Sequence, residues 1–159
     1  MSANEHTATK GTPSPRWAVW ARFLIRCKSG EPYLARLRLI QTPLFGVYLH
    51  DIFEPDDGDP HNHPWSFVSI VLRGAYTEYV YLDPLGEPRR LVSKRHGRWS
   101  AHAMGRKAAH RIVAADPKLK TLILTGPRSS SGWGFFEPRP LSSGGGRRYV
   151  PWQEYGGSR

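Results

Sequence analysis

The chain has 159 residues, of which 39% are hydrophobic and 12% aromatic, which is enough for one domain with a buried core. Lys and Arg total 23 against 13 Asp and Glu, giving a formal net charge of +10. A basic balance favours anionic partners. However, the sequence has no run of five or more like charges, so sequence-specific nucleic-acid binding is not expected.

The sequence has no stretch of eighteen apolar residues, so we expect no membrane-spanning helix. Residues 1–15 lack the apolar core of a signal peptide. The single cysteine, Cys27, excludes an intrachain disulfide and fits a reducing compartment. Together these features predict a cytoplasmic protein.

Residues 1–15 are polar and aperiodic, which predicts a disordered tail. After this tail, short apolar or alternating runs are separated by Gly, Pro and Asp turns, with no long helical period. This pattern predicts an all-β sandwich or closed barrel. The ten expected strands span residues 21–28, 33–40, 44–53, 65–72, 75–82, 89–96, 99–104, 110–114, 120–125 and 132–136.

Two of the turns predict hairpins. Gly and Pro within 29–32 indicate that the first two strands form a hairpin. The dipeptide Arg73-Gly74 indicates a second hairpin, between 65–72 and 75–82.

The chemistry-bearing motif is His61-Asn62-His63, which precedes an apolar run. Residues two apart in a strand share a face, so both imidazoles can reach one metal ion at about 2 Å. An isolated pair of this kind is also typical of a polar loop. A third histidine, His110, opens another strand-like run and is the third candidate ligand.

These histidines, in this order, resemble those of the cupin (RmlC-like jelly-roll) superfamily. Gly74 matches the glycine that closes the first cupin motif, and the 47-residue separation of His63 and His110 is ordinary for the family. The resemblance covers about residues 45–136, and the motifs are also similar to those of uncharacterised small bacterial and phage cupins with three histidines. It implies a single-domain jelly-roll β-barrel over residues 16–137, and the Ser/Gly/Arg-rich segment 138–159 is expected to dock on it through Trp152.

The sequence departs from the cupin pattern at two places. Many cupins have a glutamate four or five residues after the histidine pair, where this chain has Phe67 and Val68. The usual Pro-x-Gly before the last histidine is also missing. The resemblance therefore implies a metal held by His61, His63 and His110, with no carboxylate ligand from positions 67 and 68. Fe(II) is the expected metal, and Zn, Ni or Mn are the alternatives.

Glu78 is the one acid in the middle of a predicted strand. Three roles at the site are open to it: a fourth ligand, a hydrogen-bond acceptor for a ligand imidazole, or a general base. The alternative is an exposed partner of a basic residue on a neighbouring strand. His102 also lies near the site in sequence and is a further candidate for the metal shell or for the surface.

The remaining candidates are aromatic and basic. Tyr48 and Tyr76 are candidate catalytic residues, because a phenol that points into a barrel can donate a hydrogen bond to substrate or oxygen. Arg73, Arg111 and Trp133 are candidate substrate-binding residues, since arginine binds carboxylates and phosphates in a bidentate manner.

Three interpretations follow. The first is a non-haem iron enzyme of the three-histidine oxygenase type that acts on a small anionic molecule. The second is a non-catalytic cupin in which the metal is a structural plug and the protein binds a small ligand or a protein partner. The third is a nucleic-acid-associated protein that uses its arginine surface. A homodimer is compatible with all three.

Overall fold

The computed structural model describes residues 5–7, 17–27, 30–85 and 91–156. These residues form strands and one 3-10 turn, Leu141–Ser143, so the all-β prediction is confirmed. Among them, no helix is long and apolar enough to cross a membrane. The strands are β1 (Glu5–Thr7), β2 (Ala18–Arg26), β3 (Pro32–Gln41), β4 (Gly46–Ile52), β5 (Phe67–Arg73), β6 (Tyr76–Tyr81), β7 (Leu91–His96), β8 (Ala101–Met104), β9 (Ala109–Ala115), β10 (Leu119–Thr125), β11 (Gly134–Pro138) and β12 (Arg147–Pro151).

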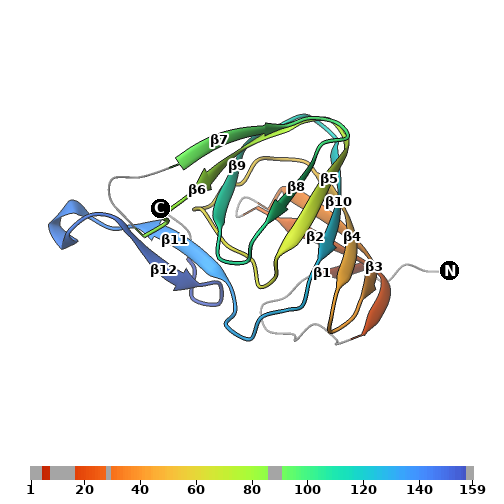
Figure 1. Ribbon diagram of the computed structural model, residues 1–159, viewed down its shortest axis with the longest axis horizontal. Helices are drawn as coiled ribbons and strands as arrows, with labels where there is room; N and C mark the ends of the chain where they lie inside the picture. The colour runs from red at the N-terminus through yellow and green to blue at the C-terminus, as the bar shows by residue number, and fades with distance from the viewer. Residues whose placement is uncertain (1–4, 8–16, 28–29, 86–90, 157–159) are drawn as a thin grey trace.

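The strands form two main layers and a C-terminal hairpin (Figure 1). The larger sheet has the order β1-β2-β3-β4-β10-β5-β8, and the smaller sheet has the order β7-β6-β9. Strand β10 comes late in the sequence but pairs antiparallel with both β4 and β5. These long-range pairings give the jelly-roll arrangement, in which the chain repeatedly passes between layers.

The core lies between the two sheets. Leu34, Val71 and Leu119 of the larger sheet pack with Tyr76 and Ile112 of the smaller sheet, and all five side chains are buried. On the central strands β5 and β10 the buried residues alternate with more exposed ones; in β5, residues 67, 69 and 71 are buried. The period-2 pattern of the sequence therefore reports the inward faces of both sheets.

The predicted hairpin around Arg73-Gly74 is wrong. Strand β5 pairs with β10 and β8, whereas β6 pairs with β7 and β9, so the chain crosses from one sheet to the other at Gly74. The crossing is tight: Gly74 has φ +75, a backbone conformation that residues other than glycine rarely adopt. A turn signal shows that the chain reverses, but it does not show whether the two strands pair or face each other across the core.

The hairpin of the first two strands is confirmed as β2 and β3. Within the predicted tail, Glu5–Thr7 forms a short strand parallel to β2, and 1–4 and 8–15 lie outside the described residues. Parts of two predicted strands, 28 and 89–90, and the turn residue 29 also lie outside them. At the other end of the chain, β12 pairs with β11, and Trp152 stacks on Trp133 with ring centroids 5.9 Å apart.

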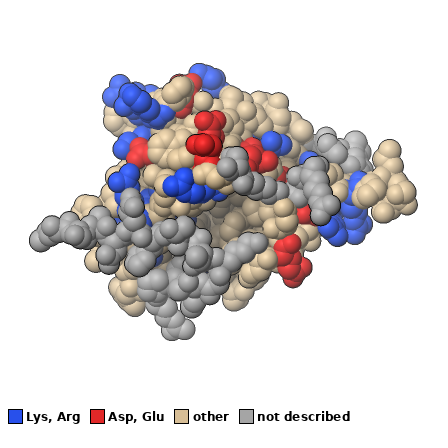
Figure 2. All heavy atoms as spheres, turned by 180° about the vertical axis from the view of Figure 1, so that it is seen from behind, with Lys and Arg blue, Asp and Glu red and all other residues tan. Residues whose placement is uncertain are grey.

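The surface carries its charge in separate groups. Figure 2 shows Lys and Arg side chains at several places on one face, with acidic side chains between them. This dispersion agrees with the charge pattern of the sequence and offers no continuous basic track on this face.

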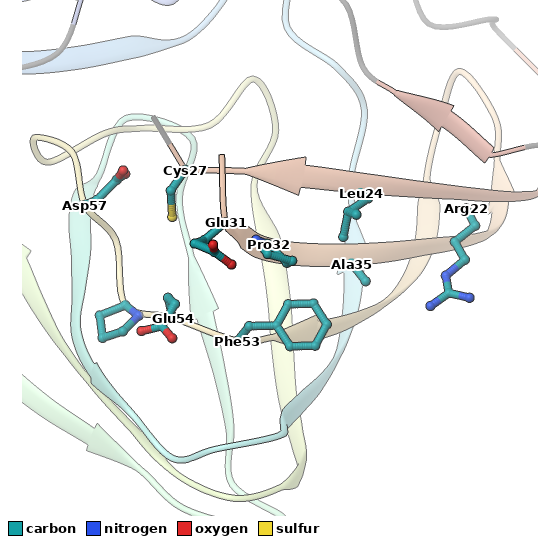
Figure 3. A pocket seen from close by; sticks show the side chains of 10 residues that line it. Arg22, Leu24, Cys27, Glu31, Pro32, Ala35, Phe53, Glu54 and Asp57 are labelled. Atoms are coloured by element: carbon teal, nitrogen blue, oxygen red, sulfur yellow. The ribbon is translucent and has the colours of Figure 1, made fainter. Parts of the chain in front are cut away.

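A cavity of about 700 Å³ lies beside β2 and β3 (Figure 3). Leu24, Ala35 and Phe53 form apolar walls, carboxylates such as Asp57 lie among the lining side chains, and no histidine is one of its described lining residues. Cys27 also lines this cavity. Burial and the nearby carboxylate of Asp57 raise the pKa of the Cys27 thiol, so it stays protonated and weakly nucleophilic at neutral pH.

Candidate metal centre

Backbone pairing brings the histidines of the motif to His110. His61 forms isolated antiparallel bridges with His110 of β9 and with Phe135 of β11. Its backbone N–H and carbonyl each bond to His110, both at 3.0 Å. His61 therefore acts as a one-residue strand between β9 and β11, and its side chain is fixed beside that of His110.

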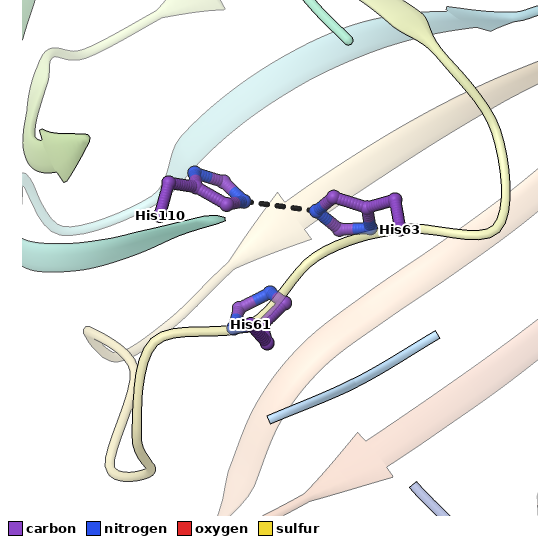
Figure 4. A group of neighbouring side chains, drawn as sticks. All are labelled: His61, His63 and His110. Atoms are coloured by element: carbon purple, nitrogen blue, oxygen red, sulfur yellow. Dashed lines mark hydrogen bonds between the residues drawn. The ribbon is translucent and has the colours of Figure 1, made fainter. Parts of the chain in front are cut away.

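The sequence indicated that His61 and His63 share a strand. They do not share a regular strand, because β5 begins only at Phe67. His63 lies in the irregular segment before β5, and its ring packs edge-on against Phe67 with centroids 4.9 Å apart. The three imidazoles nevertheless converge, with centroid separations of 5.0–5.1 Å (Figure 4).

The nitrogen positions fit one metal ion. One ligand atom from each histidine lies within 4.8 Å of the others. The Nε2 atoms of His63 and His110 are 2.8 Å apart. Two nitrogens bound to one ion at about 2.0–2.1 Å, with perpendicular bonds, are about 2.9 Å apart. The donor set of three imidazoles suits Fe(II), Zn, Ni or Cu.

Glu78 orients His110 from behind. Its Oε2 atom accepts a hydrogen bond from His110 Nδ1 at 2.7 Å, which leaves His110 Nε2 free to bind a metal. The exposed fraction of Glu78 is 0%, so the alternative of an exposed cross-strand partner is wrong. The position follows from the β6–β9 register, in which Val80 faces His110 and Glu78 lies diagonally across from it.

Protonation states favour metal binding at neutral pH. Burial lowers the pKa of His61 to about 4 and lowers that of His63 well below its ordinary value, and the nearby imidazoles lower the His63 value further. Both rings are therefore neutral and carry a free lone pair. Burial raises the pKa of Glu78, but its hydrogen bonds with His110 and His96, together with electrostatic attraction to His110 and His102, outweigh burial and leave the pKa lowered, so the carboxylate is ionised.

A second group lies on the other side of the Glu78 carboxylate. Glu78 Oε1 is 2.9 Å from His96 Nε2 and 3.7 Å from His102 Nε2. The hydroxyl of Tyr76 is 3.3 Å from His102 Nε2. Tyr76 thus belongs to this second group. His96 was not a sequence candidate, because no motif marks it.

The structure places the other candidates in different surroundings. Trp133 lies beside His61, with ring centroids 6.3 Å apart. Tyr48 is buried, and its hydroxyl donates to Gln41 at 3.2 Å. Arg111 donates to the backbone carbonyl of Asp56 at 3.2 and 3.3 Å. Arg73 is exposed at the far end of β5, roughly 20 Å along the strand from Phe67. The structure therefore brings Trp133 to the histidines, and Tyr48, Arg111 and Arg73 are occupied or placed elsewhere.

A cavity of about 200 Å³ opens at His63. Two cationic side chains, Arg106 and Lys107, line it together with Asn62 and Tyr149. Arg106 and Lys107 follow a glycine in the turn between β8 and β9, so the chain that delivers His110 also delivers two positive charges. The sequence signal for this cavity was the Gly-Arg-Lys turn before the third histidine.

Comparisons with known proteins show the fold. No protein-family model matches the sequence, and no curated protein matches it. Among solved structures, HEPD of Streptomyces albus with 2-hydroxyethylphosphonate and Fe(II) bound is 13% identical, with a TM-score of 0.53 over 70% of this chain and 25% of that chain. Oxalate decarboxylase of Bacillus subtilis is 12% identical, with a TM-score of 0.52 over 74% of this chain and 31% of that chain. KdgF from Halomonas sp. is 22% identical over 64% of this chain and 86% of that chain, with a TM-score of 0.49. The chain thus spans a third or less of the length of HEPD and of oxalate decarboxylase.

Proposed function

Since the chain has the cupin fold, we propose that it is a metal-dependent enzyme of the non-haem iron oxygenase type that acts on a small anionic molecule. The observation that carries the proposal is the convergence of His61, His63 and His110, one of which, His63, lines a basic cavity. A bound Fe(II) would supply Lewis acidity and one-electron chemistry with oxygen at this position.

Each group around the cavity has a role in the proposal. His61, His63 and His110 hold the metal, and Glu78 keeps the proton of His110 on Nδ1. No carboxylate of the histidine motif takes a metal position, because the places of the usual glutamate are Phe67 and Val68. Phe67 is buried and packs on His63, so this wall excludes water from the site.

The cavity also indicates the substrate. Its volume of about 200 Å³ is below the roughly 300–1,000 Å³ of pockets for drug-sized ligands, so the substrate has few heavy atoms. Arg106 and Lys107 favour a negative charge, since a guanidinium binds a carboxylate or phosphonate through two hydrogen bonds. The substrate of HEPD, 2-hydroxyethylphosphonate, combines these two properties, and it is therefore the probe of choice.

Nitric oxide, a surrogate for oxygen, tests the proposal. We expect the Fe(II)-loaded protein to give an iron-nitrosyl electron paramagnetic resonance signal without air. We expect the signal to shift as 2-hydroxyethylphosphonate is added, and the protein to consume oxygen with a substrate of this class.

Two arginine variants localise the effect. R106A should lower the affinity for the anion, measured from the concentration that gives half of the shift, about 10-fold or more, because a charged hydrogen bond contributes about 1.5–3 kcal/mol. R98A removes an exposed arginine packed on Trp99 and should leave the shift unchanged. An iron-loaded protein that gives no nitrosyl signal would contradict the oxygenase proposal and favour a structural metal plug.

A further inference from the structure

We propose that Glu78, His96 and His102 form a second metal site for a divalent ion such as Zn²⁺, separate from the three-histidine group. The two sites would share the Glu78 side chain through different oxygens. This proposal concerns metal binding only and does not require that the protein be an oxygenase.

The distances fit coordination by two nitrogens and one oxygen. Glu78 Oε1 is 2.9 Å from His96 Nε2 and 3.7 Å from His102 Nε2, and one ligand atom from each of the three residues lies within 4.8 Å of the others. Two donors bound to a tetrahedral ion at about 2.0–2.1 Å are about 3.3–3.4 Å apart. The two measured distances lie on either side of this value.

The two imidazoles are already arranged side by side. The rings of His96 and His102 stack with centroids 3.9 Å apart and an interplanar angle of 23°. They come from different sheets, at the end of β7 and within β8, and a short connection joins them. In this connection Ser100 bonds to the Gly97 carbonyl, and Trp99 and Ser100 bond to the backbone of Val71. The fold therefore holds both rings in place before any ion binds.

Charge also favours an ion at this point. Glu78 is fully buried, and among the described residues its basic partners within 4.0 Å are the imidazoles of His96, His102 and His110. A buried carboxylate that lacks a cation is costly. Oε2 accepts the His110 hydrogen bond and Oε1 accepts that of His96, so a second cation would bind at Oε1 and replace the His96 proton.

The two groups also differ in their surroundings. The three-histidine group lies beside a cavity, as expected for a site that exchanges substrate. In the second group, the side chains of Glu78 and His96 are 1% and 10% exposed, and that of His102 is 14% exposed. A closed site with few open positions is typical of a structural ion, which would hold the two sheets together.

Zinc counting tests the proposal. Protein stripped with a chelator is saturated with Zn²⁺, freed of excess metal and analysed for zinc per chain, and anomalous diffraction at the zinc edge locates each ion. We expect two ions in the wild type. We expect one in H102A, at the three histidines, and one in H61A, at Glu78. The control Y76F removes a hydroxyl near His102 but no ligand, and should retain two ions.

One zinc ion at the three histidines in both the wild type and H102A, with no anomalous peak at Glu78, would overturn the proposal. The group would then be a hydrogen-bonded network in which His96 donates to Glu78. Thermal melting shows whether each variant is folded, and the anomalous map of the wild type decides the question even if H102A fails to fold. Failure of the oxygenase proposal is read from the nitrosyl signal and oxygen consumption, and it leaves the zinc count unchanged.

Discussion

Replacing Glu78 by Gln should weaken metal binding at the three histidines without disturbing their side chains. Glu78 is fully buried and accepts the His110 Nδ1 hydrogen bond at 2.7 Å. Gln keeps nearly the same volume but has no charge and only one accepting oxygen. Loss of a buried partner of a ligand histidine typically lowers metal affinity 10- to 100-fold. We therefore expect a loss of about 1.4–2.7 kcal/mol in binding free energy.

The affinity is measured by competition with a chromophoric chelator, using Co²⁺ or Zn²⁺. The experiment is made in the H102A background, so that only the three-histidine group contributes. E137Q is the matched control, because Glu137 pairs with Arg148 on the outer hairpin, away from the histidines. An affinity for E78Q within twofold of its parent would refute the argument that Glu78 holds His110 in its metal-binding tautomer.

Two further predictions concern stability. The pKa of His61 in the folded chain is lowered from 6.5 to about 4, so the unfolded chain binds more protons between these values. The contribution of His61 to the free energy of unfolding should therefore be fully present above pH 6.5 and be lost as the pH falls toward 4. Urea titrations of the metal-free protein across this range check this, and a flat profile would contradict it. W152A should lower the free energy of unfolding by about 0.5–1.5 kcal/mol, because it removes the ring stack on Trp133. The exposed Trp17 provides the control W17A, and equal effects of the two changes would show that the stack contributes nothing.

The sequence predicted the strands better than it predicted their neighbours. All ten expected strands are present, because alternation of apolar and polar residues directly reports the inward face of a strand. The same alternation does not tell which strands pair. The segments before and after Gly74 were therefore expected to form a hairpin, although they belong to different sheets.

At the candidate metal site, too, the sequence indicated residues but not how the strands bring them together. His61 and His63 were proposed as ligands from their spacing and His110 from the family resemblance, but neither revealed that His61 pairs with β9 and β11 as a single residue. Glu78 was a candidate with several roles, and only the β6–β9 register places it behind His110. His96 carries no local signal, because its contacts with Glu78 and His102 depend on strands that are brought together by the fold.

We expect His61, His63 and His110 to hold one divalent metal ion. Anomalous diffraction from crystals of the Fe(II)-loaded protein, recorded on both sides of the iron edge, tests it most directly. We predict a peak within about 2.0–2.3 Å of one nitrogen of each of the three histidines. Iron that is absent from this position in loaded crystals, or bound only elsewhere on the protein, would contradict the claim.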